Sequence, residues 1–281
     1  MPDEVKKHFQ IRFPKLGEMS NEWESAVKNA KSDQSFDRFW KALFKNTNSN
    51  LEYPVFEEGS VIATRKAFGA TLDKFAEQVP NIVGGSADLE PSNYTTNFAH
   101  KYGDFSKENK LGRNLAFGVR EFPMAAAMNG IALHGGLIPF GGTFLVFADY
   151  ERPALRLASI QKCGVIHEFT HDSFWVGEDG PTHQPVEQAM SLRAIPGFNV
   201  FRPADAKETV ASFKLAMNNK TSPSALLLTR QGVPVLNQPI DEIIEGVGRG
   251  AYIVVEENSP ELVFLATGSE VSLAMNVASN M

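Results

Sequence analysis

The sequence is almost free of cysteine, since Cys163 is the only one among 281 residues. One cysteine cannot form an intrachain disulfide, which suits a reducing compartment, and we expect a cytoplasmic protein. Long apolar runs are missing too: the most apolar stretch, residues 137–148, is interrupted by Pro139, Gly141 and Gly142 and is too short to span a bilayer. The first ten residues are charged, so no secretory signal is visible and we expect no membrane partner.

Neither sign of charge dominates the chain. Lys and Arg number 27 against 33 Asp and Glu, which gives a formal net charge of -6. Such a mildly acidic surface gives no reason to expect nucleic acid or an anionic membrane as a partner. Hydrophobic residues make up 43% of the chain, enough for a sizeable core.

Two kinds of apolar segment alternate along residues 58–236. Helical spacing of apolar residues predicts helices, and alternation with a period of two predicts strands. The expected helices are residues 68–79, 123–134, 155–162, 185–195 and 206–217, and the expected strands are 115–119, 164–169, 199–201 and 225–228. Because strands that alternate with helices pair in parallel, we expect an α/β domain, a parallel sheet with helices on both faces.

Residues 1–57 differ from this middle part. Aromatic residues lie there among Lys, Asp, Asn and Ser. The spacing over residues 35–44 predicts a helix, and residues 46–50 are polar and turn-like. We interpret residues 1–57 as a connector segment with helical pieces.

Residues 237–281 form a third region. Apolar runs predict strands over residues 251–255 and 262–266, and a helix is expected from Gly268. Two strands and one helix cannot bury a core. We therefore interpret this region as an incomplete second α/β unit.

Polar segments follow several expected strands, where the working groups of parallel sheets gather. Residues 170–183 hold two histidines and three acids. They could form a metal site from His171, Asp179 and His183. They could also be an acid/base and hydrogen-bonding cluster for a polar substrate, or a polar loop whose His and Asp side chains cap helices. The spacing leaves all three open, although no short His pair of the zinc-helix kind is present.

Glu121 follows the expected strand 115–119 and begins a helix rich in Met and Ala. Loss of water there would favour the protonated carboxyl, which could donate a hydrogen bond. The alternative is a carboxylate that the helix dipole stabilises.

Three aromatic residues, Phe144, Phe147 and Tyr150, follow Gly141-Gly142-Thr143 at i, i+3 and i+6. We expect them on one side of a helix. Such a stripe usually packs into a core, but it could also stack on a flat heteroaromatic ligand.

Two isolated arginines, Arg65 and Arg230, lie near the ends of expected elements. The segment 84–93 is a strand-end turn with hydroxyl and acid groups. The arginines could grip a phosphate, or they could be ordinary surface residues.

Together these segments resemble the transketolase family. The match runs from about Gly59 to Gln231 without a large gap, and several long motifs in one order make it specific. The matching motifs are Gly84 to Leu89 with Pro91-Ser92-Asn93, Phe117 to Glu121, Gly142-Thr143-Phe144, His171-Asp172-Ser173 with Gly177 to Pro185, Arg202 to Asp205, and Thr229-Arg230-Gln231. Gly268-Ser269-Glu270 resembles the start of the family's third domain.

The resemblance implies transfer of a two-carbon ketol unit between sugar phosphates in the pentose phosphate pathway, with thiamin diphosphate and a divalent metal, Mg or Ca. It implies a thiamin-diphosphate-binding fold of the pyrimidine type. Glu121 would hydrogen-bond the aminopyrimidine ring nitrogen and would be catalytic together with His171. The implied cofactor residues are Glu121, Phe144, Phe147, Tyr150 and Asp88, and the implied substrate residues are Arg65, Ser92, His171, Asp179, His183 and Arg230.

The chain departs from the family in three respects, and the first is Phe122-Pro123 after Glu121, which leaves the first helical turn without one backbone donor. Phe174-Trp175 replaces the small and aliphatic pair expected before Val176, and Trp175 could narrow access to the substrate. The family's first domain holds the diphosphate and the metal through a Gly-Asp-Gly segment, which does not occur here. A diphosphate with its metal needs dedicated ligands, so we expect little activity from this chain alone. The expected partner is a chain that carries the first domain, or a second transketolase chain.

Other functions stay open. A dihydroxyacetone synthase would share these motifs, whereas the loop with His171 and Glu178-Asp179 disfavours a deoxyxylulose-phosphate synthase. A chain of another class, a non-catalytic fragment or subunit of a transketolase, is also compatible with the sequence.

Overall fold

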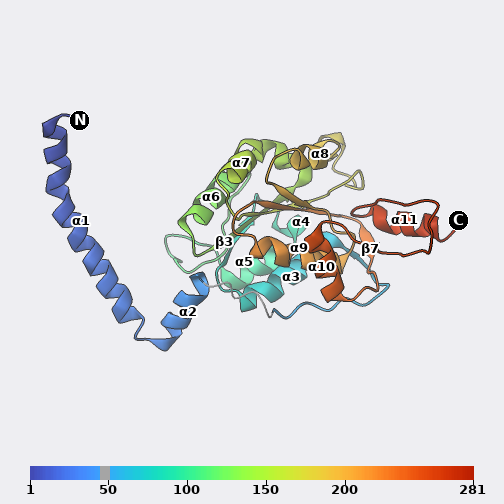
Figure 1. Cartoon of the computed structure of the whole chain (residues 1–281), viewed down its shortest axis with the longest axis horizontal. Coiled ribbons are helices and arrows are strands. Elements are labelled where there is room, and N and C mark those ends of the chain that lie inside the picture. Colours follow the sequence, from blue (N-terminus) through green and yellow to red (C-terminus); the bar gives the residue numbers. More distant parts are fainter. Residues whose placement is uncertain (45–50) are drawn as a thin grey trace. The chain divides into compact units, whose positions relative to one another are not determined.

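The computed structural model describes residues 1–44 and 51–281 (Figure 1). They fall into two compact units, one on each side of residues 45–50, and each unit is described by itself. The turn-like stretch expected over residues 46–50 lies outside the described residues.

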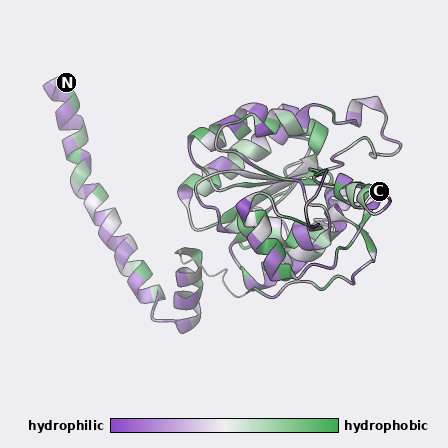
Figure 2. Ribbon diagram, turned by 45° about the vertical axis from the view of Figure 1, so that its right-hand side comes forward, coloured by the Kyte–Doolittle hydropathy of each residue, from purple (hydrophilic) through white to green (hydrophobic). Residues whose placement is uncertain are grey.

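The N-terminal unit consists of helices α1 (Asp3–Ala30) and α2 (Gln34–Phe44), so the helix expected over residues 35–44 is confirmed. Asp33 caps α2, because its Oδ1 accepts hydrogen bonds from two backbone N–H groups of the first turn. The ring centroids of Trp23 in α1 and Trp40 in α2 lie 6.3 Å apart, so the two helices contact each other through these side chains. No residue of α1 is buried, and polar residues alternate with apolar ones along it (Figure 2).

The C-terminal unit is built on a parallel sheet of five strands in the order β2-β3-β4-β6-β5. Its strands are β2 (Ile82–Ser86), β3 (Ile138–Phe144), β4 (Ile166–Thr170), β5 (Asn199–Phe201) and β6 (Ser224–Leu228). A second, antiparallel pair joins β1 (Val61–Ala63) to β7 (Gly232–Pro234). The parallel sheet expected from the sequence is confirmed.

Helices cover both faces of this sheet, as expected (Figure 1). One face carries α3 (Thr64–Gln78), α9 (Ala206–Asn218) and α10 (Ile240–Arg249), and the other carries α6 (Glu121–His134), α7 (Ala148–Ile160) and α8 (Gln188–Arg193). The short helices are α4 (Glu90–Asn93), α5 (Thr96–Tyr102), η2 (Leu145–Phe147) and η3 (Pro181–His183), and α11 (Glu270–Ala278) follows near the C-terminus.

Each face of the sheet has its own apolar core. Leu226 and Leu228 of β6 pack with Phe68 of α3 and Phe213 of α9, whereas Leu227, between them, packs in the other core. This is the period of two that a strand buried on both faces requires. The Phe68 and Phe213 rings are fully buried, and their centroids lie 4.9 Å apart. Burial of each such side chain stabilises the folded state by about 1.5–3 kcal/mol relative to leaving it exposed.

A pair of side-chain bonds that resembles a capping box begins α9. Asp205 Oδ1 accepts a hydrogen bond from the N–H of Glu208 (2.8 Å), and Glu208 Oε2 accepts one from the N–H of Ala204 (2.7 Å). Asp205 Oδ2 also accepts from the N–H of Leu236 (2.8 Å), which ties the segment after β7 to this helix.

Two groups of expected strands are wrong. Residues 115–119 form no strand. This part of the chain bonds to β2 only at its start, where the N–H of Gly84 donates to Arg113 O and the N–H of Leu115 donates to Gly84 O. Residues 251–255 and 262–266 also form none: within residues 51–281 no strand pairs with them, and most of their apolar side chains are exposed.

Two helix boundaries also differ. Helix α7 begins at Ala148 and continues through Pro153, so it starts well before the expected residue 155. Helix α8 begins only at Gln188, whose Oε1 accepts a hydrogen bond from the N–H of Val186. The expected domain boundaries after residues 57 and 236 stay predictions.

Candidate active site

The carboxyl ends of β2, β3, β4 and β6 lie at one edge of the sheet, because all four strands are parallel. Gly84, Gly85 and Ser86 belong to β2 itself, so the expected turn begins only at Ala87. The polar segments after these strands therefore start side by side. This is the edge at which α/β proteins bind ligands.

A row of aromatic rings begins at this edge. The ring centroids of Phe144 and Phe147 are 5.9 Å apart with planes 7° apart, and Phe147 and Tyr150 are separated by the same distance at 30°. The single helix expected for them is wrong: Phe144 ends β3, Phe147 ends η2, and only Tyr150 lies in α7. The row is nonetheless continuous, and Tyr150 is 64% exposed at its outer end.

Both histidines of the loop after β4 meet this row. The His171 ring stacks on Phe144 at a centroid distance of 3.8 Å, and the His183 ring lies edge-on to Phe147 at 5.2 Å. His171 Nδ1 lies 2.9 Å from Thr170 Oγ1. Burial, followed by the charges of Arg65 and Arg230 and the nearby His183, lowers the pKa of His171 to about 3. His171 is therefore a neutral hydrogen-bonding group at physiological pH.

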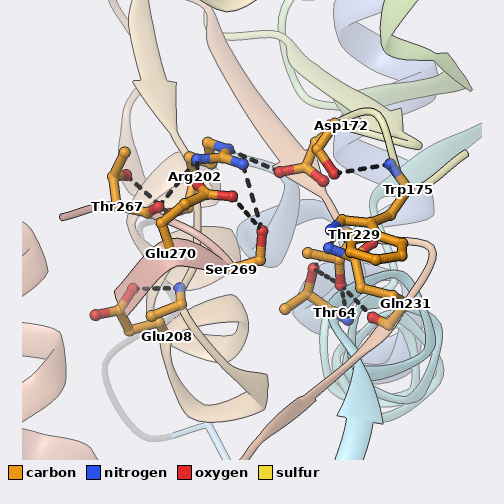
Figure 3. A network of polar contacts seen from close by, with 12 residues as sticks. Thr64, Asp172, Trp175, Arg202, Glu208, Thr229, Gln231, Thr267, Ser269 and Glu270 are labelled. Atoms are coloured by element: carbon orange, nitrogen blue, oxygen red, sulfur yellow. Dashed lines mark hydrogen bonds and ion pairs between the residues drawn. The ribbon is translucent and has the colours of Figure 1, made fainter. Parts of the chain in front are cut away.

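Two threonines hold the arginine-bearing segments together. The N–H of Thr64 donates to Thr229 Oγ1 (2.9 Å), and the N–H of Thr229 donates to Thr64 Oγ1 (2.7 Å); Figure 3 shows this exchange. Both threonines are fully buried. Arg65 and Arg230 directly follow these two threonines. The hydrogen bonds therefore bring the two arginines close together, although they lie 165 positions apart along the sequence.

The guanidinium of Arg65 donates from Nη1 to the backbone oxygen of Ser92 (2.9 Å), and it lies over the ring of Tyr94. Burial lowers the pKa of Arg65, an effect that Tyr94 opposes and Arg230 reinforces. Its Nε is buried and has no hydrogen-bond partner in the described part of the chain. Two adjacent cations with a free buried N–H group favour an anion such as a phosphate.

Arg230 packs against the loop after β4. A Cβ atom on Gly177 would lie 2.8 Å from Arg230 Cζ, and Gly177 has a φ of +97°. Only glycine fits here, because both the close approach and the backbone conformation exclude a side chain. Asp179 in the same loop is exposed, and its charge acts on Arg65.

Glu121 and Asp88 are not linked to this group by hydrogen bonds or ring contacts in the described residues. Glu121 is the half-buried first residue of α6, and its charge acts on Glu151. Asp88 is exposed with a φ of 64°. Within the described ranges, no side-chain hydrogen bond or ring contact joins either residue to the aromatic row or to the histidines.

Three buried ionisable residues were missed by the sequence analysis. Glu168 lies in β4, where burial raises its pKa well above the ordinary value, against the opposing effects of Arg65 and Asn93. His167, next to it, places Nδ1 3.0 Å from Oε2 of the equally buried Glu151. The signal was available, since His and Glu side by side are unusual in a strand that is covered on both faces.

Metal-binding and membrane-spanning features are also absent from the described residues. Among residues 1–44 and 51–281, no group of three or more His, Cys, Asp or Glu side chains is placed to hold a metal ion. None of the described helices combines the length and the apolar character needed to cross a membrane.

Comparisons with known proteins agree with this fold. The family description "Transketolase, pyrimidine binding domain" matches residues 60–235. The transketolase of Halalkalibacterium halodurans is 54% identical over 224 residues, which cover 79% of this chain and 33% of that protein. The solved transketolase from Leishmania mexicana superposes with a TM-score of 0.90 at 39% identity, over all of this chain and 42% of that one.

A further solved structure is a split-gene transketolase described as an inactive β4 tetramer. It matches with a TM-score of 0.53 at 32% identity, over 64% of this chain and 55% of that one. The chain thus spans less than half of the full-length relatives that it matches.

The parallel sheet with helices on both faces and the family match over residues 60–235 place this part of the chain in the class of pyrimidine-binding α/β domains. The length and identity of the match go further than the class. The chain belongs to the transketolase family.

Proposed function

We propose that this chain forms the pyrimidine-binding and substrate-binding part of a transketolase site. That site transfers a two-carbon ketol unit between sugar phosphates with thiamin diphosphate. The observation that carries the proposal is the neutral, buried His171 stacked on Phe144 beside Arg65 and Arg230. It combines an uncharged hydrogen-bonding group for sugar hydroxyls with a cation pair for a phosphate.

The phosphate of the sugar would bind at Arg65 and Arg230, with Ser92 beside them. Arg65 is already oriented by its hydrogen bond to the Ser92 backbone oxygen. His171, His183 and Asp179 would then bind hydroxyl groups along the sugar. His171 suits this role because a neutral imidazole both donates and accepts, whereas an imidazolium only donates.

The aromatic residues of the proposed site fit a flat heteroaromatic ring. Phe144, Phe147 and Tyr150 form a continuous row whose outer member is exposed. Glu121 would hold the aminopyrimidine nitrogen with its carboxyl group, and Asp88 would lie near the cofactor. Thiamin diphosphate, when bound, supplies the nucleophilic carbon that carries the two-carbon unit.

The diphosphate and its divalent metal would be held by another domain or another chain. The sequence contains no Gly-Asp-Gly segment. A known relative with a split gene is described as inactive in a tetramer of one chain type, which is compatible with this division of the site. We therefore propose low activity for this chain alone, and a partner that carries the first domain. The single buried cysteine supports a cytoplasmic location.

The test is to mix the chain with a separately expressed diphosphate-binding domain of a transketolase, thiamin diphosphate and Mg²⁺. Ketol transfer from xylulose 5-phosphate to ribose 5-phosphate should appear in the mixture and stay low for the chain alone. Glu121→Ala should abolish the transfer, whereas Glu108→Ala, at an exposed carboxylate, should not change it. Strong activity of the chain alone would overturn the division of the site.

The choice of acceptor separates the remaining alternatives. Preference for formaldehyde over ribose 5-phosphate would indicate a dihydroxyacetone synthase. Absence of transfer to either acceptor, in a mixture that binds thiamin diphosphate, would indicate a non-catalytic subunit.

A further inference from the structure

Two sequence motifs that the site does not use meet each other in space. Arg202, from the segment after β5, extends to Gly268-Ser269-Glu270 at the start of α11, and Figure 3 shows the resulting network. The same arginine also reaches Asp172, the residue directly after His171. The network therefore connects the C-terminal segment, residues 267–270, to the part of the candidate site that holds His171.

The guanidinium of Arg202 is shared among four groups. Nε donates to Asp172 Oδ2 (2.7 Å), and Nη1 donates to the backbone oxygen of Thr267 (2.9 Å). Nη1 also pairs with the Glu270 carboxylate, and Nη2 lies 3.5 Å from Ser269 Oγ. The planar fork of arginine can serve this many acceptors at once, which the single ammonium of lysine cannot do.

Glycine at position 268 allows this arrangement. Its φ is +62°, and a Cβ atom there would lie 2.8 Å from Cγ, Nε and Cζ of Arg202. The Arg202 side chain therefore lies directly against the backbone of Gly268. A methyl group at this position would displace the guanidinium without changing any charge.

The other end of the network holds a strained backbone. His171 has a φ of 60°, which costs roughly 1 kcal/mol or more for a residue with a side chain. Two interactions of Asp172 fix the chain just after it: its N–H donates to Leu228 O (3.1 Å), and its carboxylate, whose side chain is fully buried, accepts from Arg202. Strain of this kind persists only where the surroundings enforce it.

We propose that Arg202 is a positioning residue for His171. By joining Asp172 to residues 267–270, it keeps His171 in the left-handed conformation that places the imidazole on Phe144. The C-terminal segment thereby controls the substrate end of the site. The importance of His171 for substrate rests on the function proposed above, but the structural coupling does not.

The protonation of the His171 ring reports its position. Its pKa is lowered to about 3 by burial and by Arg65, Arg230 and His183. If His171 leaves this place, the burial is lost and its pKa rises towards the ordinary value. The titration of the six histidines in the full chain can be followed by 1H–15N NMR of the rings, with His171 assigned from His171→Gln.

Two charge-conserving variants test the proposal, Arg202→Lys and Gly268→Ala. Both should raise the pKa of His171 by at least about one unit, a tenfold change in proton affinity. The matched control is Gly250→Ala, because Gly250 has a φ of +89° with no atom near its Cβ position. It introduces similar backbone strain in the same C-terminal region and should leave His171 unchanged.

Unchanged titration of His171 in folded Arg202→Lys and Gly268→Ala would overturn the proposal. It would mean that stacking on Phe144 and the contact with Thr170 hold the ring unaided. Should Gly268→Ala fail to fold, Arg202→Lys decides alone. The readout needs neither cofactor nor turnover, so a failure of ketol transfer would not affect it.

Discussion

Nδ1 of His167 lies 3.0 Å from Oε2 of Glu151, and both side chains are completely buried. The pair joins β4 to α7, the helix that also carries Tyr150. Neither carboxylate oxygen of Glu151 and neither ring nitrogen of His167 makes a hydrogen bond of good geometry in the described residues. The interior therefore holds two polar groups that lie close together but satisfy each other's hydrogen-bonding capacity poorly.

This pair should show strong coupling between its two members. Glu151→Leu or His167→Phe alone leaves one buried polar group unpaired and should lower the free energy of unfolding by about 1–3 kcal/mol. The double variant replaces both groups by apolar ones and should lie close to the wild type or above it. Urea unfolding of the four proteins measures this cycle, and additive losses would show that the pair is not coupled.

His171 should make the folded chain sensitive to acid. An exposed histidine in the unfolded chain titrates near pH 6.5, whereas the pKa of His171 in the folded chain is about 3. Below pH 6.5 only the unfolded state binds this proton, so stability falls with decreasing pH, by about 2 kcal/mol at pH 5. His171→Gln should remove this part of the loss between pH 7 and pH 5 in urea unfolding, and His100→Gln, at an exposed site, should not.

Gly177 should matter for the phosphate end of the site. Gly177→Ala places a methyl group 2.8 Å from Arg230 Cζ and should weaken the binding of a sugar phosphate about tenfold. Gly180→Ala is the matched control, since Gly180 lies in the same loop with a φ of +80° and has free space around it. The KM for the sugar-phosphate donor in the reconstituted mixture measures both, and equal effects would assign the loss to loop strain.

Arg65 should contribute more to phosphate binding than its neighbour on the same helix. Arg65→Met removes a half-buried guanidinium and should raise the KM for the donor about 10- to 100-fold. Lys66→Met removes the same charge from an exposed position and should have little effect. A similar change in both variants would contradict a directed phosphate site.

Local pattern was sufficient to predict much of the fold. The strand expected over residues 199–201 is β5, and the capping box of Asp205 and Glu208 is present, because both depend on residues close in the sequence. Residues 115–119 show the limit of this approach. Their alternation is that of a strand, but Phe117 packs beside Met128 while Val119 is 73% exposed, and only the start of the segment bonds to β2.

The candidate site was predictable only in part. The resemblance supplied the candidate residues, but nothing in the sequence shows that Thr64 and Thr229 exchange hydrogen bonds and bring Arg65 to Arg230. The contacts of Arg202 were equally hidden, since its partners Asp172 and Glu270 lie 30 and 68 positions away. Contacts between segments this far apart follow from the sheet order, which local periodicity does not specify.

The burial of Glu168 in the central strand has a consequence for the electrical behaviour of the whole molecule. A formal charge of -6 counts every carboxyl group as an anion. Burial raises the pKa of Glu168 well above its ordinary value, so the folded chain keeps this proton to a higher pH than the unfolded chain does. In that pH interval the native chain should migrate in an electric field with one negative charge fewer than its composition states, and unfolding should release the hidden proton into the buffer.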